Sequence, residues 1–413
     1  MNIILLTNEY PPHLYGGAGV HVEFLSKELA RLDEGRCHIQ LLCFGEQRTA
    51  LDNMTVEGIG PPANYPFQDA RHQKLLETLY RNIGMTGSAG EADIVHCHTW
   101  YTLLAGCLIK RLYGIPLVIT THSLEPQRPW KEEQLGSAYR VSAWIEKTSY
   151  ENADGVIAVS NAMRAAVRGL YRVPDERISV IHNGIDLNQY KRVCDPSILK
   201  TYGIDPLKPY LLFVGRVTRQ KGILHLVNAI RWLDPDIQVV LCAGAPDTEA
   251  IAREMSEKVR EARSETKNRI LWIDQWVPRD RLICLYSGAS VFVCSSVYEP
   301  FGIIALEAMA CGVPVVASAV GGLLEVVVPG ETGELVPFEP AGPGNPEPGD
   351  PDRFSRDMAS AVNDLLRSPG KMKAMAAKSR ERVEKHFSWE SIARKTLAFY
   401  RAVATDRKPA DRR

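Results

Sequence analysis

The sequence lacks the features that mark metal-bound, exported or membrane-spanning chains. Its 413 residues include nine cysteines, an odd number, and no two of them have CxxC spacing. Several, such as Cys97 and Cys294, lie inside apolar stretches, as reduced and buried thiols do. No apolar run approaches the roughly 18 residues of a membrane span, and residues 1–12 carry no basic leader. We therefore expect a cytoplasmic protein with no signal peptide, no membrane span and no structural metal.

The sequence also lacks an excess of charge of either sign. Lys plus Arg and Asp plus Glu each number 49. No net field then draws the chain to nucleic acid or to an acidic membrane, so neither is expected as a partner. The length favours two or three domains over one.

Apolar strand-like runs alternate with amphipathic helical stretches along the whole chain. This alternation predicts an α/β fold with two Rossmann-like domains, residues 1–187 and 208–388, whose parallel sheets face a central cleft. Residues 339–352 are too rich in Pro and Gly for a regular element and are expected as a mobile surface loop. The expected strands are residues 2–7, 38–44, 93–99, 116–123, 154–160, 178–186, 210–215, 238–244, 269–274, 289–295, 313–318 and 333–338.

A basic loop follows the first strand of the second domain. Arg216 and Lys221 lie in this loop, GRVTRQKG, which is bracketed by glycines. Arg offers a fork and Lys a point charge to phosphate oxygens, so the loop is a candidate diphosphate site. The alternative is that the basic loop is solvated and binds no ligand, and this is the simpler interpretation for Arg219.

A second candidate site is the stretch SSVYEPFGIIALEAMA, where a strand leads through a turn into an apolar helix. Glu299 in the turn can accept hydrogen bonds from sugar hydroxyls, and Phe301, Gly302 and Ile303 offer backbone N–H groups at the helix start. Glu307 lies in the apolar helix, where a carboxylate is costly unless it is paired or binds a ligand such as a ribose. The alternatives for Glu307 are a buried salt bridge and a helix-end carboxylate.

Further candidate residues lie in the first domain, where Gly17 is expected to bring backbone close to a phosphate or sugar of a donor held by the other domain. Gly17 belongs to a glycine-rich turn after the first strand, and His98 and His122 follow later strands. Arg128 and Lys131 lie beyond His122 and can bind an anionic or sugar acceptor. Each also has a structural alternative, since turns use glycine, lone histidines are often structural and loop charges are often solvated. The pattern His-x-His at residues 96–98 and two Asp-Pro-Asp turns give no convincing metal site.

Taken together, these motifs resemble a known family, the retaining glycosyltransferases of the two-domain GT-B fold. Within it the chain is similar to bacterial glycogen synthases of the short actinobacterial type, also called maltose-1-phosphate synthases. The segments that carry the resemblance are YGGAGVHV, HTWYTLLAG, THSLEPQRPWKEEQLG, HNGID, GRVTRQKG and VYEPFGIIALEAMACGVPVVAS. The glycine turn lacks the lysine of the long glycogen synthases.

The resemblance implies a glucosyl donor, ADP-glucose or UDP-glucose, and transfer with retention. Arg216 and Lys221 would neutralise the diphosphate, Glu299 would orient glucose hydroxyls and His122 would hold the sugar near the reacting carbon. The base would lie near residues 274–277, which include Val277. No covalent protein nucleophile, metal or cofactor is implied.

The resemblance also implies an acceptor, either an α-1,4-glucan end or α-glucose-1-phosphate. We expect Arg128 and Lys131 to hold an acceptor phosphate and His98 to line the acceptor side. The final helix, about residues 389–405, would rejoin the first domain, and the domains would close on the donor.

Other functions are compatible with the same features. Another retaining nucleotide-sugar glycosyltransferase would share the donor motifs, and a nucleotide-sugar epimerase would share the architecture but would need acid and base groups near the sugar C2. A two-lobed periplasmic sugar-binding protein would need an export signal. The donor base, the acceptor and the oligomeric state, including a possible homo-oligomer, stay open from the sequence.

Overall fold

Two parallel sheets organise the chain. The computed structural model describes residues 1–14, 16–32, 36–61, 72–193, 195–342 and 344–405. The chain divides into a first unit, residues 1–184 with 389–413, and a second unit, residues 185–388. The end of the predicted first domain, residues 185–187, and the junction expected near residues 187–208 both lie in the second unit.

The first unit is built on an eight-stranded sheet with the order β3-β4-β2-β1-β5-β6-β7-β8. All of its strand pairs are parallel except β3 with β4. The direction of strand order reverses between β1 and β5, so the loops after these two strands meet at one edge of the sheet. The strands are β1 (Asn2–Thr7), β2 (His38–Phe44), β3 (Arg48–Leu51), β4 (Met54–Ile59), β5 (Ile94–His98), β6 (Leu117–Thr121), β7 (Gly155–Ala158) and β8 (Ile178–Val180).

Helices cover this sheet through apolar faces of helical period. In the first helix, Val22, Leu25 and Leu29 recur at spacings of three and four residues and all are buried. The helices are α1 (Gly17–Arg31), α2 (Gln73–Ser88), α3 (Trp100–Tyr113), α4 (Trp130–Leu135), α5 (Ala138–Asn152), α6 (Asn161–Tyr171) and α15 (Trp389–Thr405).

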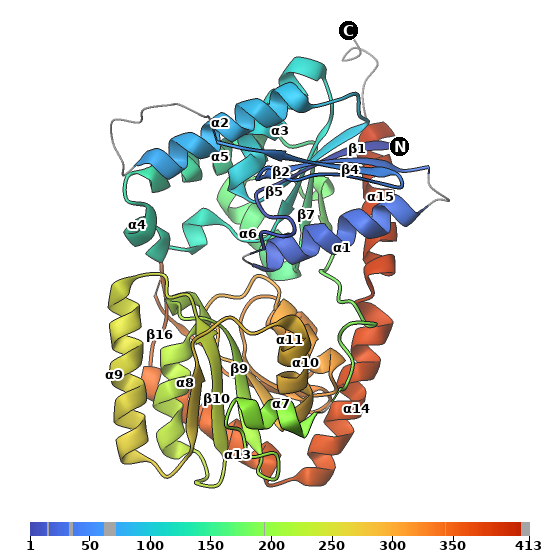
Figure 1. Cartoon of the computed structure of the whole chain (residues 1–413). Coiled ribbons are helices and arrows are strands. Elements are labelled where there is room, and N and C mark those ends of the chain that lie inside the picture. Colours follow the sequence, from blue (N-terminus) through green and yellow to red (C-terminus); the bar gives the residue numbers. More distant parts are fainter. Residues whose placement is uncertain (15, 33–35, 62–71, 194, 343, 406–413) are drawn as a thin grey trace. The chain divides into compact units, whose positions relative to one another are not determined.

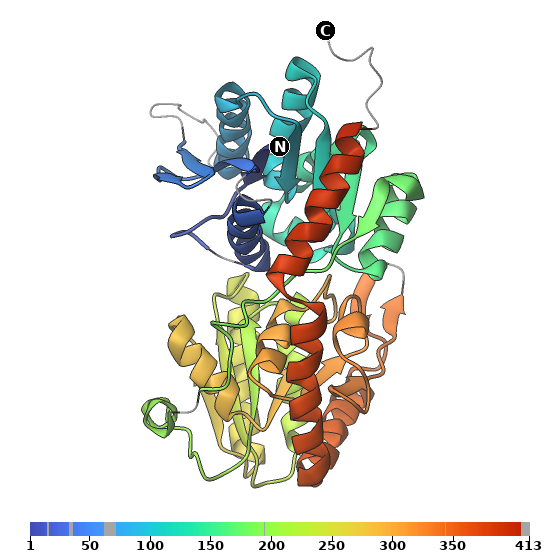
Figure 2. The same cartoon turned by 90° about the vertical axis from the view of Figure 1, so that its right-hand side faces the viewer.

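The last helix, α15, packs in this first unit beside α1, as both views show (Figures 1 and 2). Its buried residues Trp389, Ile392, Thr396 and Tyr400 recur at helical spacing, and the apolar ones join the core of α1 and β1. The Tyr400 hydroxyl hydrogen-bonds His96 on β5. The C-terminal helix is thus part of the first unit's core.

The second unit has a six-stranded parallel sheet with the order β11-β10-β9-β12-β13-β14. This is the strand order of a Rossmann fold, and its reversal point lies between β9 and β12. The strands are β9 (Tyr210–Arg216), β10 (Gln238–Gly244), β11 (Ile270–Ile273), β12 (Val291–Cys294), β13 (Val315–Ser318) and β14 (Gly333–Val336).

Helices cover both faces of the second sheet (Figure 1). The helices α8, α9 and α13 share one core with β9 and β10, whereas α11 contacts α10, α12 and α14. The helices are α7 (Pro196–Thr201), α8 (Ile223–Ala229), α9 (Glu249–Glu265), α10 (Arg279–Gly288), α11 (Ile303–Ala310), α12 (Leu323–Val326), α13 (Pro351–Leu366) and α14 (Pro369–His386). This α/β architecture confirms the predicted fold class.

The segment expected as a mobile loop contains a β-hairpin instead. β15 (Pro340–Gly342) and β16 (Asn345–Pro348) pair antiparallel, and Gly344 adopts a φ of +77° at the turn. The Glu347 carboxylate lies 2.9 Å from His225 Nε2 on α8. Pro and Gly therefore shape a short hairpin here, which is secured by a side-chain contact with a neighbouring helix.

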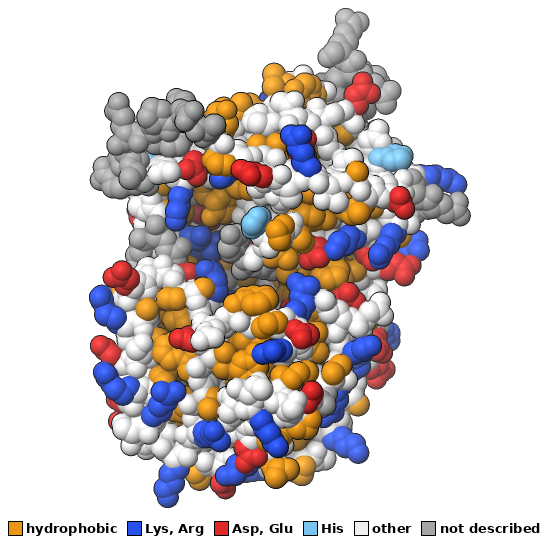
Figure 3. Space-filling view, in the orientation of Figure 1, with side chains coloured by type: hydrophobic (Ala, Val, Ile, Leu, Met, Phe, Trp, Pro, Cys, Tyr) orange, Lys and Arg blue, Asp and Glu red, His pale blue; other side chains and the backbone are white. Residues whose placement is uncertain are grey.

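In the described part of the chain, no helix has the length and apolar character needed to cross a membrane. On the visible face, Lys and Arg side chains are interspersed with Asp and Glu (Figure 3), as the equal numbers of both signs suggest. The cysteines within the described ranges are all free thiols: Cys37, Cys43, Cys97, Cys107, Cys242, Cys284, Cys294 and Cys311.

Candidate active site

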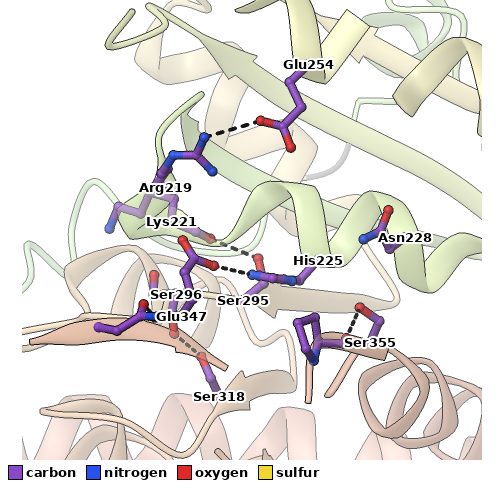
Figure 4. A network of polar contacts seen from close by, with 12 residues as sticks. Arg219, Lys221, His225, Asn228, Glu254, Ser295, Ser296, Ser318, Glu347 and Ser355 are labelled. Atoms are coloured by element: carbon purple, nitrogen blue, oxygen red, sulfur yellow. Dashed lines mark hydrogen bonds and ion pairs between the residues drawn. The ribbon is translucent and has the colours of Figure 1, made fainter. Parts of the chain in front are cut away.

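The two predicted donor motifs meet at the reversal point of the second sheet. One is the loop after β9, and the other is the turn after β12. Gly222 adopts a φ of +58°, and a Cβ added there would lie 2.0 Å from the Ser295 carbonyl oxygen. Ser295 Oγ donates to the Lys221 carbonyl (2.9 Å), and Val297 N donates to the Gln220 carbonyl (3.0 Å). The two loops are thus joined by hydrogen bonds to the backbone, and Figure 4 shows Ser295 beside Lys221.

Lys221 and Glu299 form an ion pair across this junction. Lys221 Nζ lies 2.7 Å from Glu299 Oε2, and Ser296 Oγ donates to the same oxygen at 2.9 Å. The side chains are only 20% and 9% exposed. Burial alone would lower the pKa of Lys221, but the Glu299 carboxylate raises it above its ordinary value, so the ammonium stays charged. The site therefore holds a fixed positive charge beside a fixed negative one.

Arg216 ends β9 on the same edge and is half exposed. Its Nη1 donates to Asp247 Oδ1 at 2.6 Å, and Asp247 lies in the loop after β10. Arg219, from the same basic loop, pairs with Glu254 at 3.5 Å on the surface. Such exposed pairs contribute little to stability, about 0–1 kcal/mol, so a solvated role suits Arg219. Asp247 is a partner that no sequence motif indicated.

The helix α11 starts directly after the turn that carries Glu299. Gly302 caps it with a φ of +110°, a conformation that favours glycine. Phe301 is buried, whereas Ile303 is partly exposed in the first helical turn, where backbone N–H groups lack intrahelical partners. Gly321, with a φ of +52°, allows the Glu299 carbonyl to approach and to accept from Gly322 N at 2.9 Å. The turn is thus closed by the Gly321–Gly322 backbone, and Ile303 at the start of the helix is partly exposed.

Glu307 is buried on α11 and is held by two tyrosines. Tyr190 donates to Oε1 and Tyr286 to Oε2, each at 2.8 Å. Burial raises the pKa of Glu307, while these two hydrogen bonds act to lower it. The expected alternative of a buried salt bridge is replaced by a pair of hydroxyl donors. Each carboxylate oxygen has a further lone pair for a ligand.

The loop after β11 contains residues 274–277, which are expected to lie near the nucleotide base. Val277 is 8% exposed, whereas the neighbouring Trp276 is 84% exposed. The Asp274 carbonyl lies 2.4 Å from the position of a Cβ added to Gly244, so glycine at the end of β10 lets this loop approach. The loop therefore lies beside the one that carries Asp247.

In the first unit, the loops after β1 and β5 meet at the reversal point of the sheet. Thr99 Oγ1 donates to Asn8 Oδ1 at 2.8 Å. Thr99 itself adopts a φ of +67° and a ψ of 158°, which costs a β-branched residue about 1–3 kcal/mol. Gly17 opens α1 and is exposed on the same side of β1. Strained backbone at this edge is consistent with a site there.

Four histidines cluster at this edge of the first sheet. His98 Nδ1 lies 3.0 Å from His122 Nε2, and His21 Nδ1 lies 2.7 Å from Asn183 Oδ1. His98 is fully buried, and His122 is partly exposed. Burial lowers the pKa of His21 to about 4. Burial and the neighbouring imidazoles lower the pKa values of His96, His98 and His122 well below their usual range, so the cluster is neutral. Sequence reasoning found His98 and His122 but missed His21.

The segment that carries Arg128 and Lys131 lies over a buried acidic network. Arg128 Nη1 donates to Ser123 Oγ at 3.2 Å and lies 3.8 Å from Glu125. Glu146 accepts from the Glu125 backbone N–H at 2.8 Å and from the Tyr171 hydroxyl. Burial and the adjacent Glu125 raise the pKa of Glu146 to about 8. Lys131 lies in the first turn of α4 and is partly exposed. Arg128 is thus held by neighbours, while Lys131 reaches the surface.

Comparison with known proteins extends over both units. Residues 15–189 match Glycosyltransferase Family 4, and residues 196–382 match Glycosyl transferases group 1. The chain is 43% identical over 409 residues to the alpha-maltose-1-phosphate synthase of Mycolicibacterium smegmatis, covering 98% of this chain and 100% of that protein.

Two more distant proteins match at similar coverage. The chain is 28% identical over 440 residues to a glycogen synthase of Mycobacterium tuberculosis, covering 100% of this chain and 97% of the relative. Its structure is similar to that of sucrose-phosphate synthase from Thermosynechococcus elongatus, with a TM-score of 0.77, 26% identity, and coverage of 98% and 100%.

Proposed function

The chain belongs to the GT-B glycosyltransferases of the alpha-maltose-1-phosphate synthase type, as its sequence motifs predicted, and from this premise we propose which reaction it catalyses. The proposed reaction transfers glucose from ADP-glucose or UDP-glucose to α-glucose-1-phosphate or to an α-1,4-glucan end, with retention of the α configuration. The enzyme thereby serves α-glucan synthesis.

The observation that carries this proposal is the Lys221–Glu299 pair at the reversal point of the second sheet, with Arg216 on the same edge. A nucleotide-sugar has an anionic diphosphate next to a neutral sugar rich in hydroxyls. A site with cations beside a carboxylate matches both parts. Arg216 and Lys221 would stabilise the charge that develops on the leaving diphosphate, and Glu299 would accept hydrogen bonds from glucose hydroxyls.

The nucleotide is assigned to the neighbouring features of the same unit. The first turn of α11, where Ile303 is partly exposed next to the Gly302 cap, would offer backbone N–H groups to phosphate. Glu307 has lone pairs available for ribose hydroxyls, and the loop that contains Val277 would receive the base. Two protein cations supply the charge neutralisation that a divalent ion provides in other sugar transferases, so we propose that no metal or cofactor is needed.

The acceptor is assigned to the first unit. His122 is the partly exposed histidine of its cluster and would hold the transferred sugar near the reacting carbon. Lys131 and Arg128 would bind the phosphate of glucose-1-phosphate, and Gly17 would bring the start of α1 close to a ligand. His98 was expected to line the acceptor side, but its full burial favours an indirect role.

Retention is proposed to follow a front-face route. The bond between the anomeric carbon and the diphosphate oxygen breaks, and the acceptor hydroxyl attacks from the same face. The departing diphosphate oxygen takes the acceptor proton. Glu299, the carboxylate assigned to the donor glucose, is already engaged by Lys221 and Ser296, which suits a binding role better than nucleophilic attack.

Release of nucleoside diphosphate tests the proposal. Purified protein is incubated with ADP-glucose or UDP-glucose, in the presence of glucose-1-phosphate, of glycogen, or of no acceptor. We expect at least one of the two donors to release nucleoside diphosphate, and we expect this release to require an acceptor. Equal release without any acceptor would indicate a hydrolase, and conversion of the donor into an isomeric nucleotide-sugar would indicate an epimerase. Either result contradicts the proposal.

A further inference from the structure

Three histidines from three different elements converge in the first unit. His21 comes from α1, His98 from the end of β5 and His122 from the residue after β6. Their ring centroids lie 4.8–5.3 Å apart, and one ring nitrogen of each lies within 4.8 Å of those of the other two. His21 and His98 are 2% and 0% exposed, whereas His122 is partly exposed. A ligand that reaches this cluster therefore meets His122.

The hydrogen bonds of the buried rings indicate where their protons lie. A neutral imidazole has one N–H and one lone pair. The Nδ1 atoms of His21 and His98 have partners, Asn183 Oδ1 and His122 Nε2. Their Nε2 atoms are buried and have no hydrogen-bond partner among the residues that the structure describes. An orphaned N–H donor is rarer in protein interiors than an under-satisfied acceptor. Both rings are therefore best described with the proton on Nδ1 and the lone pair on Nε2.

This arrangement determines the tautomer of the third ring. Because His98 Nδ1–H donates to His122 Nε2 across 3.0 Å, that nitrogen of His122 must hold the lone pair. The proton of His122 then lies on Nδ1. A ring with both a fixed orientation and a fixed tautomer presents one N–H donor to a ligand oxygen.

We propose that His98 is a positioning residue that fixes His122 as an Nδ1–H donor toward a hydroxyl or phosphate oxygen of the bound sugar. His98 does not touch the ligand itself. The positioning role of His98 rests on the proposed function only for the identity of the bound sugar, because the tautomer of His122 is a property of the protein alone. His96 supports the arrangement from behind, where Tyr400 and Thr120 hold its two nitrogens at 2.5 and 2.7 Å.

The same proton positions argue against a metal held by all three rings. A metal takes the lone pair of a ring nitrogen. The lone pair of His122 is engaged by His98, so only the Nε2 lone pairs of His21 and His98 are left. Two lone pairs in a buried site suit a water molecule better than a tetrahedral ion.

The direct test is nitrogen NMR of the full chain labelled with 15N-histidine. Long-range proton–nitrogen correlations distinguish Nδ1–H from Nε2–H, and a His122→Gln variant assigns the His122 signal. The expected result is an Nδ1–H tautomer for His122 in the wild-type protein. An Nε2–H tautomer would overturn the inference, whatever the enzyme transfers. Added Co²⁺ should leave these signals unchanged, and a tetrahedral Co²⁺ absorption spectrum that disappears in the His98→Leu variant would also overturn it.

Matched variants of His98 test its role in activity. His98→Asn keeps an N–H near the place of Nδ1, His98→Gln places its amide near Nε2, and His98→Leu has no donor. We expect His98→Leu and His98→Gln to lower kcat 10- to 100-fold with KM changed less than threefold, and His98→Asn to stay within fivefold of wild type. Loss of activity in all three with the His122 tautomer unchanged would refute positioning. If wild type shows the expected tautomer but transfers no sugar, the proposed function fails while the tautomer assignment stands.

Discussion

Replacement of Lys221 by alanine probes the donor site most sharply. The Lys221 ammonium lies 2.7 Å from Glu299, and the lysine side chain is one-fifth exposed. Its removal deletes a cation and leaves the Glu299 carboxylate with Ser296 as its side-chain partner among the described residues. A hydrogen bond to a charged group contributes about 1.5–3 kcal/mol to stability. We therefore expect Lys221→Ala to lower the free energy of unfolding by about that amount and to remain folded.

The loss of turnover follows from Coulomb's law. A unit charge 4 Å from the ammonium interacts by about 4 kcal/mol at an effective dielectric constant near 20. If between half and all of one charge develops on the leaving diphosphate, Lys221 stabilises the transition state by about 2–4 kcal/mol. Since each 1.36 kcal/mol is tenfold in rate, kcat should fall by roughly 30- to 1000-fold.

Arg219→Ala is the matched control, because Arg219 lies two residues away in the same loop and pairs only on the surface. Steady-state rates of nucleoside diphosphate release, together with thermal melting of each variant, measure the two effects separately. We expect Arg219→Ala to stay within twofold of wild type. A folded Lys221→Ala variant with turnover within threefold of wild type, or equal losses in both variants, would refute the diphosphate assignment.

Three further predictions concern the acceptor segment, the acidic network and the donor loops. Lys131→Ala should raise the KM for glucose-1-phosphate about tenfold and leave the KM for the donor unchanged; an unchanged acceptor KM would contradict the phosphate contact. The pKa of Glu146 is raised to about 8 in the folded chain, above its ordinary value of 4.5, so the folded state binds the extra proton and stability should fall as pH rises from about 4.5 to 8. Glu146→Gln should flatten the melting temperature over this range, and an equally steep profile in the variant would contradict the assignment. Gly222→Ala should destabilise the protein by about 2 kcal/mol or more, because the added Cβ would lie 2.0 Å from a carbonyl oxygen. Gly169 in helix α6 is the control, since a Cβ there would meet open space. Gly169→Ala should stabilise the protein by about 0.5–1 kcal/mol in the same melts. Similar melting temperatures for these two glycine variants would count against the geometry of the donor loops.

Periodicity predicted the parts of the fold in which burial dominates. The apolar runs that became β1, β9 and β12 were expected within a residue or two of their ends, because strands buried on both faces read as continuous apolar stretches. The antiparallel pair β3 and β4 was not expected, although Asn53, with a φ of +59°, marks its turn. Because β3 and β4 are short and partly exposed, their sequences contain no continuous apolar run that would predict them.

The sequence predicted the site residues that belong to motifs at strand ends. It did not predict their side-chain partners, which come from distant parts of the sequence. Lys221 and Glu299 were expected near one another because both follow strands of the same sheet. Asp247 and Tyr286 carry no motif, yet they bind Arg216 and Glu307 through contacts set by packing. His98 likewise packs against His21 on α1, which the sequence does not place against β5.

The identity and configuration of the product test the central claim most directly. The protein is incubated with glucose-1-phosphate and either ADP-glucose or UDP-glucose, and the product is examined by proton, carbon and phosphorus NMR. The account predicts a new α-1,4 linkage with the phosphate ester retained, and the corresponding chain extension when glycogen replaces glucose-1-phosphate. A β-configured product, or no glucosyl transfer to either acceptor from either donor, would contradict it.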